Sequence, residues 1–119
     1  MNNGFKDPTI NALLENASVV GVDVDGTLCY EICWTPKDCL VATPRQEVID
    51  KVRELYLKQK YIVIATSRKP QLAEATLMWL DKNNVPYHAI DFRKTACDVL
   101  IDDKVINVED FIKKTETKK

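Results

Sequence analysis

The amino-acid sequence predicts an α/β fold, in which a parallel sheet of four to five strands and its helices form three layers. Short apolar runs, typical of buried strands, alternate with longer stretches whose apolar residues recur at helical spacing. Several of these apolar runs end directly in an acidic or hydroxyl side chain. The length of 119 residues predicts a single domain over residues 1–119, with residues 1–6 and 115–119 frayed at its ends.

The first third of the chain predicts a short helix, a strand and an irregular segment. Asp7-Pro8 is typical of a helix N-cap followed by a proline at the first helical position. Residues 18–23 form an apolar run that ends in Asp23, which is typical of a central strand covered on both faces. Residues 29–42 combine aromatic, proline and charged residues without helical spacing, so we expect a loop or a short hairpin there.

The rest of the chain continues the alternation of helices and strands. Thr43-Pro44-Arg45-Gln46 has the pattern of a capping box and predicts the start of a helix, whose sheet-facing side carries Val48, Val52, Leu55 and Tyr56. The elements predicted after it are a strand at 61–65, a helix from Pro70 to about Asn83-Asn84, strands at 87–90 and 99–101, and a helix at 108–114.

The composition is that of an ordinary globular protein and excludes some functional classes. Lys and Arg number 17 against 18 Asp and Glu, and the two signs are interleaved, so we expect no extended nucleic-acid binding. The first eight residues lack the apolar core of a signal peptide, and no apolar run approaches the ~20 residues of a membrane span. We therefore expect a soluble, cytoplasmic protein with no membrane partner.

Three of the four cysteines, Cys29, Cys33 and Cys39, lie within eleven residues, and Cys97 lies far from them. This grouping invites a zinc site, but the chain has no Cys-x-x-Cys pair and its only histidine, His88, is distant in the sequence. We expect reduced thiols in a cytosolic protein and leave the role of the segment open.

Polar side chains that follow the predicted strands point to a shared site. Asp23, Thr66 and the pair Asp102-Asp103 each come directly after an apolar run. The carboxyl ends of parallel strands lie along one edge of a sheet, where ligands bind. With Asp25 included, four carboxylates would gather there and repel one another unless a cation lay among them. Carboxylate oxygens favour Mg²⁺, which also bridges carboxylates to a phosphate.

The stretch Asp23-Val24-Asp25-Gly26-Thr27-Leu28 resembles the first motif of the haloacid dehalogenase superfamily, whose phosphatases carry Asp-x-Asp-Gly-Thr after the first strand. The resemblance implies a Rossmann-like fold and a magnesium-dependent phosphatase that forms a phospho-aspartyl intermediate. In that mechanism Asp23 is the nucleophile, and Asp25 protonates the leaving group and then activates water. The backbone carbonyl of Asp25 would bind the metal, and the amides of Gly26 and Thr27 would donate to phosphate.

The other motifs of the superfamily follow in order. Thr66 resembles the second motif, with Ser67 beside it as a further phosphate-binding hydroxyl, and Lys94 resembles the third, a cation that neutralises phosphate charge. Asp102-Asp103 resembles the fourth, and we favour Asp103 as direct ligand with Asp102 behind it, although the order of the two stays open. The predicted metal ligands are thus Asp23, Asp25, Asp102 and Asp103.

A closer likeness is to small phosphatases associated with capsular polysaccharide biosynthesis, in which a Phe-x-Lys segment runs into a strand and Ile-Asp-Asp-Lys. Here Phe92-Arg93-Lys94 leads to Ile101-Asp102-Asp103-Lys104 in the same way. The phosphatase half of polynucleotide kinase-phosphatases is a more distant relative. Lys94 is followed by Thr95 and not by the commoner proline, so Lys69 remains a rival for the phosphate-binding role.

Larger members of the superfamily insert a cap domain, and this chain leaves no room for one. Only residues 29–42 are available as a flap over the site. An uncapped site accepts bulky substrates, and a second subunit of a homo-oligomer is an alternative cover. We expect a phosphorylated small molecule as substrate, for example a sugar phosphate or a nucleotide, and phosphorylated nucleic-acid ends and phosphoproteins stay open as alternatives. Tyr30 and Trp34 either stack on a base or sugar or seal the flap against the sheet.

Four further side chains have simpler interpretations. Arg68 and Lys69, next to the predicted phosphate site, either hold a second substrate anion or are solvated. His88 and Trp79 are predicted to be structural.

Two other functional classes are compatible with parts of this pattern. A receiver-like phospho-acceptor module also groups acids, a hydroxyl and a lysine around Mg²⁺, but its phosphorylated aspartate comes on a middle strand. A catalytically silent binding protein with the same fold would not need the full set of motif residues. The order of the motifs along this chain favours the hydrolase.

Overall fold

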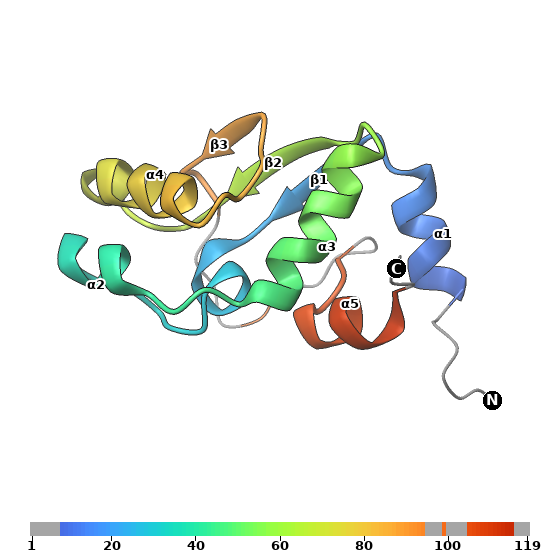
Figure 1. Cartoon of the computed structure of the whole chain (residues 1–119), viewed down its shortest axis with the longest axis horizontal. Helices are drawn as coiled ribbons and strands as arrows, with labels where there is room; N and C mark the ends of the chain where they lie inside the picture. The colour runs from blue at the N-terminus through green and yellow to red at the C-terminus, as the bar shows by residue number, and fades with distance from the viewer. Residues whose placement is uncertain (1–7, 95–98, 100–104, 116–119) are drawn as a thin grey trace.

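The computed structural model describes residues 8–94, 99 and 105–115. Its parallel sheet contains β1 (Val19–Val22), β2 (Tyr61–Ala65) and β3 (Ala89–Asp91) in that spatial order (Figure 1). The helices are α1 (Pro8–Asn16), α2 (Pro36–Val41), α3 (Gln46–Leu57), α4 (Ala73–Lys82) and α5 (Val108–Lys114), with short turns η1 (Val24–Leu28) and η2 (Pro70–Leu72). The chain is thus an α/β protein built on a small parallel sheet.

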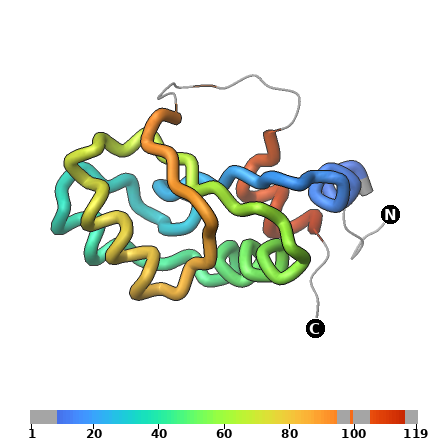
Figure 2. The backbone as a smooth tube through the Cα atoms, turned by 90° about the horizontal axis from the view of Figure 1, so that it is seen from above, coloured from blue at the N-terminus to red at the C-terminus, as the bar shows by residue number. Residues whose placement is uncertain are grey.

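The helices are arranged so that the carboxyl ends of the strands point toward one pair of them. The three strand arrows run toward α2 and α4, which pack against each other (Figure 1). Helix α3 packs on β2 and η1, and α5 contacts both α3 and α1 (Figure 2). Trp79, which is 2% exposed, donates its indole N–H to the carbonyl of Ala42 and so ties α4 to the end of α2.

The core joins the sheet to α3 and α4. Apolar side chains recur at helical spacing on α3 and at alternate positions on β2, as the predicted periodicities require. The fully buried residues of these two elements are Val48, Ile49, Val52, Ile62 and Ile64.

Several predicted elements are confirmed. The strand at 61–65 and the helix at 108–114 have the predicted bounds. The helix after Pro70 begins as the turn η2 and ends at Lys82, and Asn84 adopts the left-handed conformation that stops it, with φ +55°. His88 is structural, as expected, because its ring stacks between those of Tyr56 and Tyr61.

The predicted loop at 29–42 is wrong, because this segment contains the helix α2. Thr35 accepts a hydrogen bond from the Asp38 amide, and the Asp38 carboxylate accepts one from the Thr35 amide, so the capping box is here. The capping box predicted at 43–46 is absent from the start of α3. The hydroxyl of Thr43 donates instead to Glu31, at 2.6 Å. Both segments carry Thr-Pro, and only tertiary contacts decide which threonine caps.

The sheet also departs from the prediction. Within the described residues β1 pairs with β2 alone, and Val19 is 61% exposed, so this run is not covered on both faces as predicted. The strand expected at 87–90 begins at Ala89. The strand expected at 99–101 lies largely outside the described residues, which contain three strands and not four to five.

The ends of the described chain bear on two further expectations. Thr115 is 4% exposed and its hydroxyl donates to the carbonyl of Phe111, so this residue is not frayed as predicted. The residues before Pro8 and after Thr115, including the predicted N-cap Asp7, lie outside the described part.

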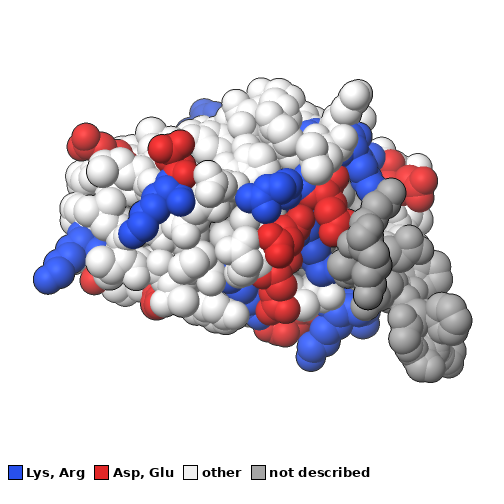
Figure 3. All heavy atoms as spheres, in the orientation of Figure 1, with Lys and Arg blue, Asp and Glu red and all other residues white. Residues whose placement is uncertain are grey.

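No helix of the described part is long and apolar enough to cross a membrane. On the face drawn in Figure 3, basic side chains lie among acidic ones and form no broad basic patch.

Candidate active site

The turn after β1 carries the two aspartates of the predicted first motif. Val22 lies opposite Ile64 in the parallel register, so Asp23 comes at the carboxyl edge of the sheet. Its Oδ1 accepts a hydrogen bond from the Val24 amide, at 2.8 Å, and so caps the turn. Gly26 follows with φ +72°, a conformation that side-chain-bearing residues rarely adopt. The glycine lets the chain reverse directly after Asp25.

Lys94 lies beside Asp23, as the motif order predicts. Its ammonium Nζ is 3.0 Å from Asp23 Oδ2, and the two side chains are 36% and 29% exposed. The Lys94 amide donates to the carbonyl of Thr66, at 3.3 Å, and the Thr66 amide donates to that of Asp91. The structure thus brings Asp23, Thr66 and Lys94 to one edge of the sheet.

Asp25 forms a bidentate ion pair with Arg68, which the sequence analysis did not predict. Arg68 Nη2 is 2.7 Å from Asp25 Oδ1, and Arg68 Nε is 3.1 Å from Asp25 Oδ2. The Cys33 amide also donates to Oδ1, at 3.2 Å. Arg68 is only 5% exposed, and its Nη1 donates to the hydroxyl of Thr76 at 2.9 Å. The signal for this pair in the sequence was an arginine three residues after Ala65, the last residue of β2.

Neither role considered for Arg68 fits this geometry. Its nitrogens donate to protein groups on both sides, so it is not solvated and does not present an anion site. Burial by itself lowers the pKa of Arg68, but the hydrogen bonds and the charge of Asp25 outweigh this and the pKa lies above its usual value. Arg68 is therefore a permanent buried cation next to Asp25.

The hydroxyl groups of the second motif differ in exposure. Thr66 is 1% exposed, and its Oγ1 accepts a hydrogen bond from the Arg68 amide at 3.1 Å. Ser67 is exposed and lies between these two residues. Lys69, the rival to Lys94, is also exposed, at the start of η2, and makes no ion pair within the described residues. Of the two lysines, Lys94 is thus the one that the structure places beside Asp23.

The flap is joined to the first-motif turn by backbone hydrogen bonds. The Gly26 amide donates to the carbonyl of Glu31, at 3.2 Å, so the amide predicted to bind phosphate has a protein partner in this structure. Thr27 is half-buried, and its amide stays a predicted donor to phosphate. Trp34 is 78% exposed and Tyr30 is 56% exposed, with its ring 5.1 Å from the Arg45 guanidinium. The alternative in which these rings seal the flap is therefore wrong.

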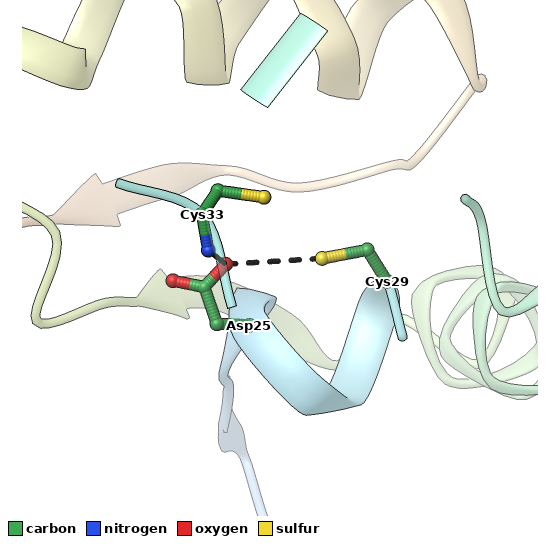
Figure 4. A group of neighbouring side chains, drawn as sticks. All are labelled: Asp25, Cys29 and Cys33. Atoms are coloured by element: carbon green, nitrogen blue, oxygen red, sulfur yellow. Dashed lines mark hydrogen bonds between the residues drawn. The ribbon is translucent and has the colours of Figure 1, made fainter. Parts of the chain in front are cut away.

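Three buried thiols surround the Asp25–Arg68 pair. Cys29, Cys33 and Cys39 are free, and ligand atoms of the first two lie with Asp25 within 4.8 Å of one another (Figure 4). Burial raises the pKa of all three thiols, that of Cys33 to about 12. A protonated thiol is a poor metal ligand. Arg68 Nη2 also lies 3.9 Å from Cys29 Sγ, so a guanidinium already supplies the positive charge.

Of the four predicted magnesium ligands, Asp23 and Asp25 lie within the described residues. Asp23 offers a partly exposed carboxylate at the sheet edge, which suits a hard cation. Asp102 and Asp103, the predicted remaining ligands, lie outside the described residues, as does Cys97. The carboxylate of Asp25 is engaged by Arg68, and its backbone carbonyl stays a predicted metal ligand.

Comparison with known proteins identifies one informative likeness. No family model matches the chain, and no curated protein matches it. The crystal structure of a structural-genomics target from Vibrio cholerae matches with a TM-score of 0.69 and 30% sequence identity, covering 80% of this chain and 87% of that one. The two chains belong to one family. The description of the Vibrio cholerae protein names no activity, so this relationship supports the fold and leaves the function to the site.

Proposed function

We propose that the protein is a magnesium-dependent phosphohydrolase of the haloacid dehalogenase type, which cleaves a phosphate monoester through a phospho-aspartyl intermediate on Asp23. The observation that carries the proposal is the meeting of three motif residues at one sheet edge. Asp23 directly follows β1, Lys94 pairs with it at 3.0 Å, and Asp25 follows two residues on, before a left-handed glycine. A carboxylate nucleophile, a cation and a second carboxylate are the groups this chemistry needs.

In the first half-reaction an Asp23 carboxylate oxygen forms a bond to the phosphorus of the ester. The bond from phosphorus to the ester oxygen breaks, its electron pair stays on that oxygen, and Asp25 gives the oxygen a proton. Lys94 lies where its charge offsets that of the incoming phosphate. The products are an alcohol and phospho-Asp23.

In the second half-reaction Asp25 removes a proton from water, and the water oxygen attacks the phosphorus. The bond from phosphorus to Asp23 breaks and its electron pair returns to the Asp23 carboxylate, which releases inorganic phosphate and restores the enzyme. The exposed hydroxyl of Ser67 and the neighbouring Thr66 are the proposed hydrogen-bond donors to the phosphoryl oxygens.

Asp23, the backbone carbonyl of Asp25 and Asp103, with Asp102 behind it, would hold the metal. When bound, Mg²⁺ reduces the repulsion between the anionic nucleophile and the anionic substrate. The finer fold in this proposal is a three-layer, Rossmann-like parallel sheet of four to five strands. Within the described residues, β1 has a strand partner on one side only.

The proposed substrate is a phosphorylated small molecule such as a sugar phosphate or a nucleotide, in a cytoplasmic setting. Between Asp25 and Lys94 the chain adds only α2, α3, η2, α4 and two strands, so no cap domain covers the site. Trp34, whose ring is exposed, directly follows Cys33 in the sequence, and the Cys33 amide donates to the carboxylate of Asp25. An aromatic or sugar leaving group at Asp25 would therefore have the flap within reach.

The test is hydrolysis of p-nitrophenyl phosphate and of a panel of phosphorylated metabolites, with Mg²⁺ and again with a chelator. We expect repeated turnover that the chelator abolishes. Asp23→Asn should abolish turnover, because the nucleophile is gone, and Asp25→Asn should slow it by about 100-fold or more, because proton transfer is lost. Asp50→Asn is the matched control, since Asp50 is an exposed aspartate of α3.

Circular dichroism and thermal melts would establish that the variants are folded. Wild-type activity in Asp23→Asn would refute the nucleophile assignment. Stoichiometric labelling by acetyl phosphate without turnover would favour the receiver-like module, and absence of both would favour a silent binding protein.

A further inference from the structure

We infer that Arg68 is a positioning residue that anchors one oxygen of the Asp25 carboxylate, Oδ1, so that the other, Oδ2, is the oxygen that exchanges the proton with the leaving group. This inference rests on the proposed function, because it assigns a role within the same reaction. It concerns a residue whose part in the site was not predicted from the sequence.

The two oxygens of Asp25 have different surroundings. Oδ1 accepts from Arg68 Nη2 at 2.7 Å, from the Cys33 amide at 3.2 Å and from Arg68 Nε at 3.3 Å, with the Cys29 thiol at 3.8 Å. Oδ2 has one donor among the described residues, Arg68 Nε at 3.1 Å. A carboxylate oxygen has two lone pairs, so Oδ1 is fully used and Oδ2 keeps one for a proton.

The anchor itself is held rigidly. The Arg68 side chain is 2% exposed and that of Asp25 is 19% exposed. Nη1 of Arg68 donates to Thr76, whose hydroxyl donates in turn to the carbonyl of Leu72 at the start of α4. A planar guanidinium that makes two parallel bonds to a carboxylate fixes both the direction and the tilt of that group. Helix α4 thereby sets the orientation of a side chain on the turn after β1.

A group that orients the acid should matter most where the leaving group needs a proton. p-Nitrophenolate is a stable anion and leaves without one, whereas the alkoxide of benzyl alcohol is strongly basic and must be protonated as it leaves. Benzyl phosphate and p-nitrophenyl phosphate are similar in size and both aromatic. The ratio of their kcat/KM values therefore reports acid catalysis in the step that forms phospho-Asp23.

The experiment measures kcat/KM of both esters with Mg²⁺ for the wild type, Arg68→Gln and Arg68→Lys. We expect Arg68→Gln to lose about 100-fold on benzyl phosphate and less than about 10-fold on p-nitrophenyl phosphate. Arg68→Lys keeps the charge but not the paired bonds, so it should show the same selective loss to a smaller degree. Arg53→Gln is the control, because Arg53 pairs with the exposed Asp50 on α3. In this variant the kcat/KM values of both esters should stay at those of the wild type.

Each result separates the inference from the proposed function. If wild type cleaves both esters but the Arg68 variants lose equal factors on the two, or lose nothing, the positioning role is overturned and the phosphatase stands. If Arg68→Gln does not fold, Arg68→Lys decides, and wild-type ratios in that variant would overturn the inference. If wild type cleaves neither ester and no metabolite of the panel, the proposed function fails and this inference fails with it.

Discussion

Arg68 shows how strongly one residue depends on contacts from several segments. It follows β2, its guanidinium pairs with Asp25 after β1, and its outer nitrogen reaches Thr76 on α4. Removing one partner of a buried pair leaves an uncompensated charge, at a cost of about 3–5 kcal/mol. The thiols of Cys29, Cys33 and Cys39 fill the space around this pair and remain protonated. Their burial has a consequence for stability at alkaline pH.

We predict that the protein loses stability above about pH 8.5, the ordinary pKa of a cysteine thiol. The folded pKa of Cys33 is raised to about 12, so its contribution is fully present below pH 8.5. Above pH 8.5 the unfolded chain releases the proton while the folded chain keeps it. The loss is at most about 1.4 kcal/mol per pH unit for each such thiol. Urea unfolding between pH 8 and pH 10 measures it.

The matched comparison is Cys33→Ala, whose free energy of unfolding should fall less steeply over the same pH range. Cys97→Ser should be the background for both proteins, so that this distant thiol does not contribute. If the free energy of unfolding falls equally steeply with pH in the two proteins, the prediction that folding keeps the Cys33 thiol protonated is wrong.

At the scale of elements, the segment from Cys29 to Arg45 is held at several points while its apolar tips stay outside. A capping box starts α2, and Trp79 of α4 holds the end of that helix. An antiparallel backbone β-bridge between Cys29 and Pro44 joins the two ends of the segment. Ile32 and Trp34 nevertheless are 64% and 78% exposed. These exposed side chains do not pack on the sheet, and under the proposed function they are available to contact the substrate.

We predict that Trp34→Ala raises KM for aromatic phosphate esters by about 5- to 100-fold, with kcat nearly unchanged, because stacking on an aromatic ring contributes about 1–3 kcal/mol. The melting temperature should change little, since the side chain is 78% exposed. Steady-state kinetics with p-nitrophenyl phosphate measures the effect. Leu57→Ala is the control, because Leu57 is an exposed apolar residue at the carboxyl end of α3. An unchanged KM would remove Trp34 from the substrate site.

At the scale of the whole molecule, the parallel register decides which residues meet. Val22 lies opposite Ile64 and Ala65 lies opposite Asp91, so the residues that follow β1 and β2 emerge at one edge together with the end of β3. The cluster of acids proposed for this edge would be costly without a cation, and a cation that binds the folded state alone adds to stability.

We predict that Mg²⁺ stabilises the folded protein and that Asp103 is needed for this effect. At ten times the dissociation constant the gain is about 1.4 kcal/mol, which corresponds to a rise of several degrees in melting temperature for a chain of this size. Thermal melts with increasing Mg²⁺ measure it. Asp103→Asn should show little rise, and Asp110→Asn, at an aspartate of α5 whose side chain is 45% exposed, should behave as wild type. The same rise in Asp103→Asn would exclude that residue as a ligand.

The sequence by itself determined the class of fold and much of the candidate site. The strand at 61–65, the helix at 108–114 and the ends of α4 follow from local periodicity and capping, which act over a few residues. The predicted meeting of Asp23 and Thr66 needed only one further assumption, that parallel strands share an edge, whereas Lys94 was added by the resemblance of the motif order to a known family.

Only the tertiary structure decided which of two equivalent Thr-Pro segments caps a helix and which charged side chains pair. Thr35 and Thr43 precede proline alike, yet Thr35 caps a helix while Thr43 bonds to Glu31, because the flap brings that carboxylate within reach. The partners Arg68 and Asp25 lie on different segments, and no short-range pattern relates them. Local patterns depend on neighbours along the chain, whereas pairing and burial depend on distances in space that only the packed molecule sets.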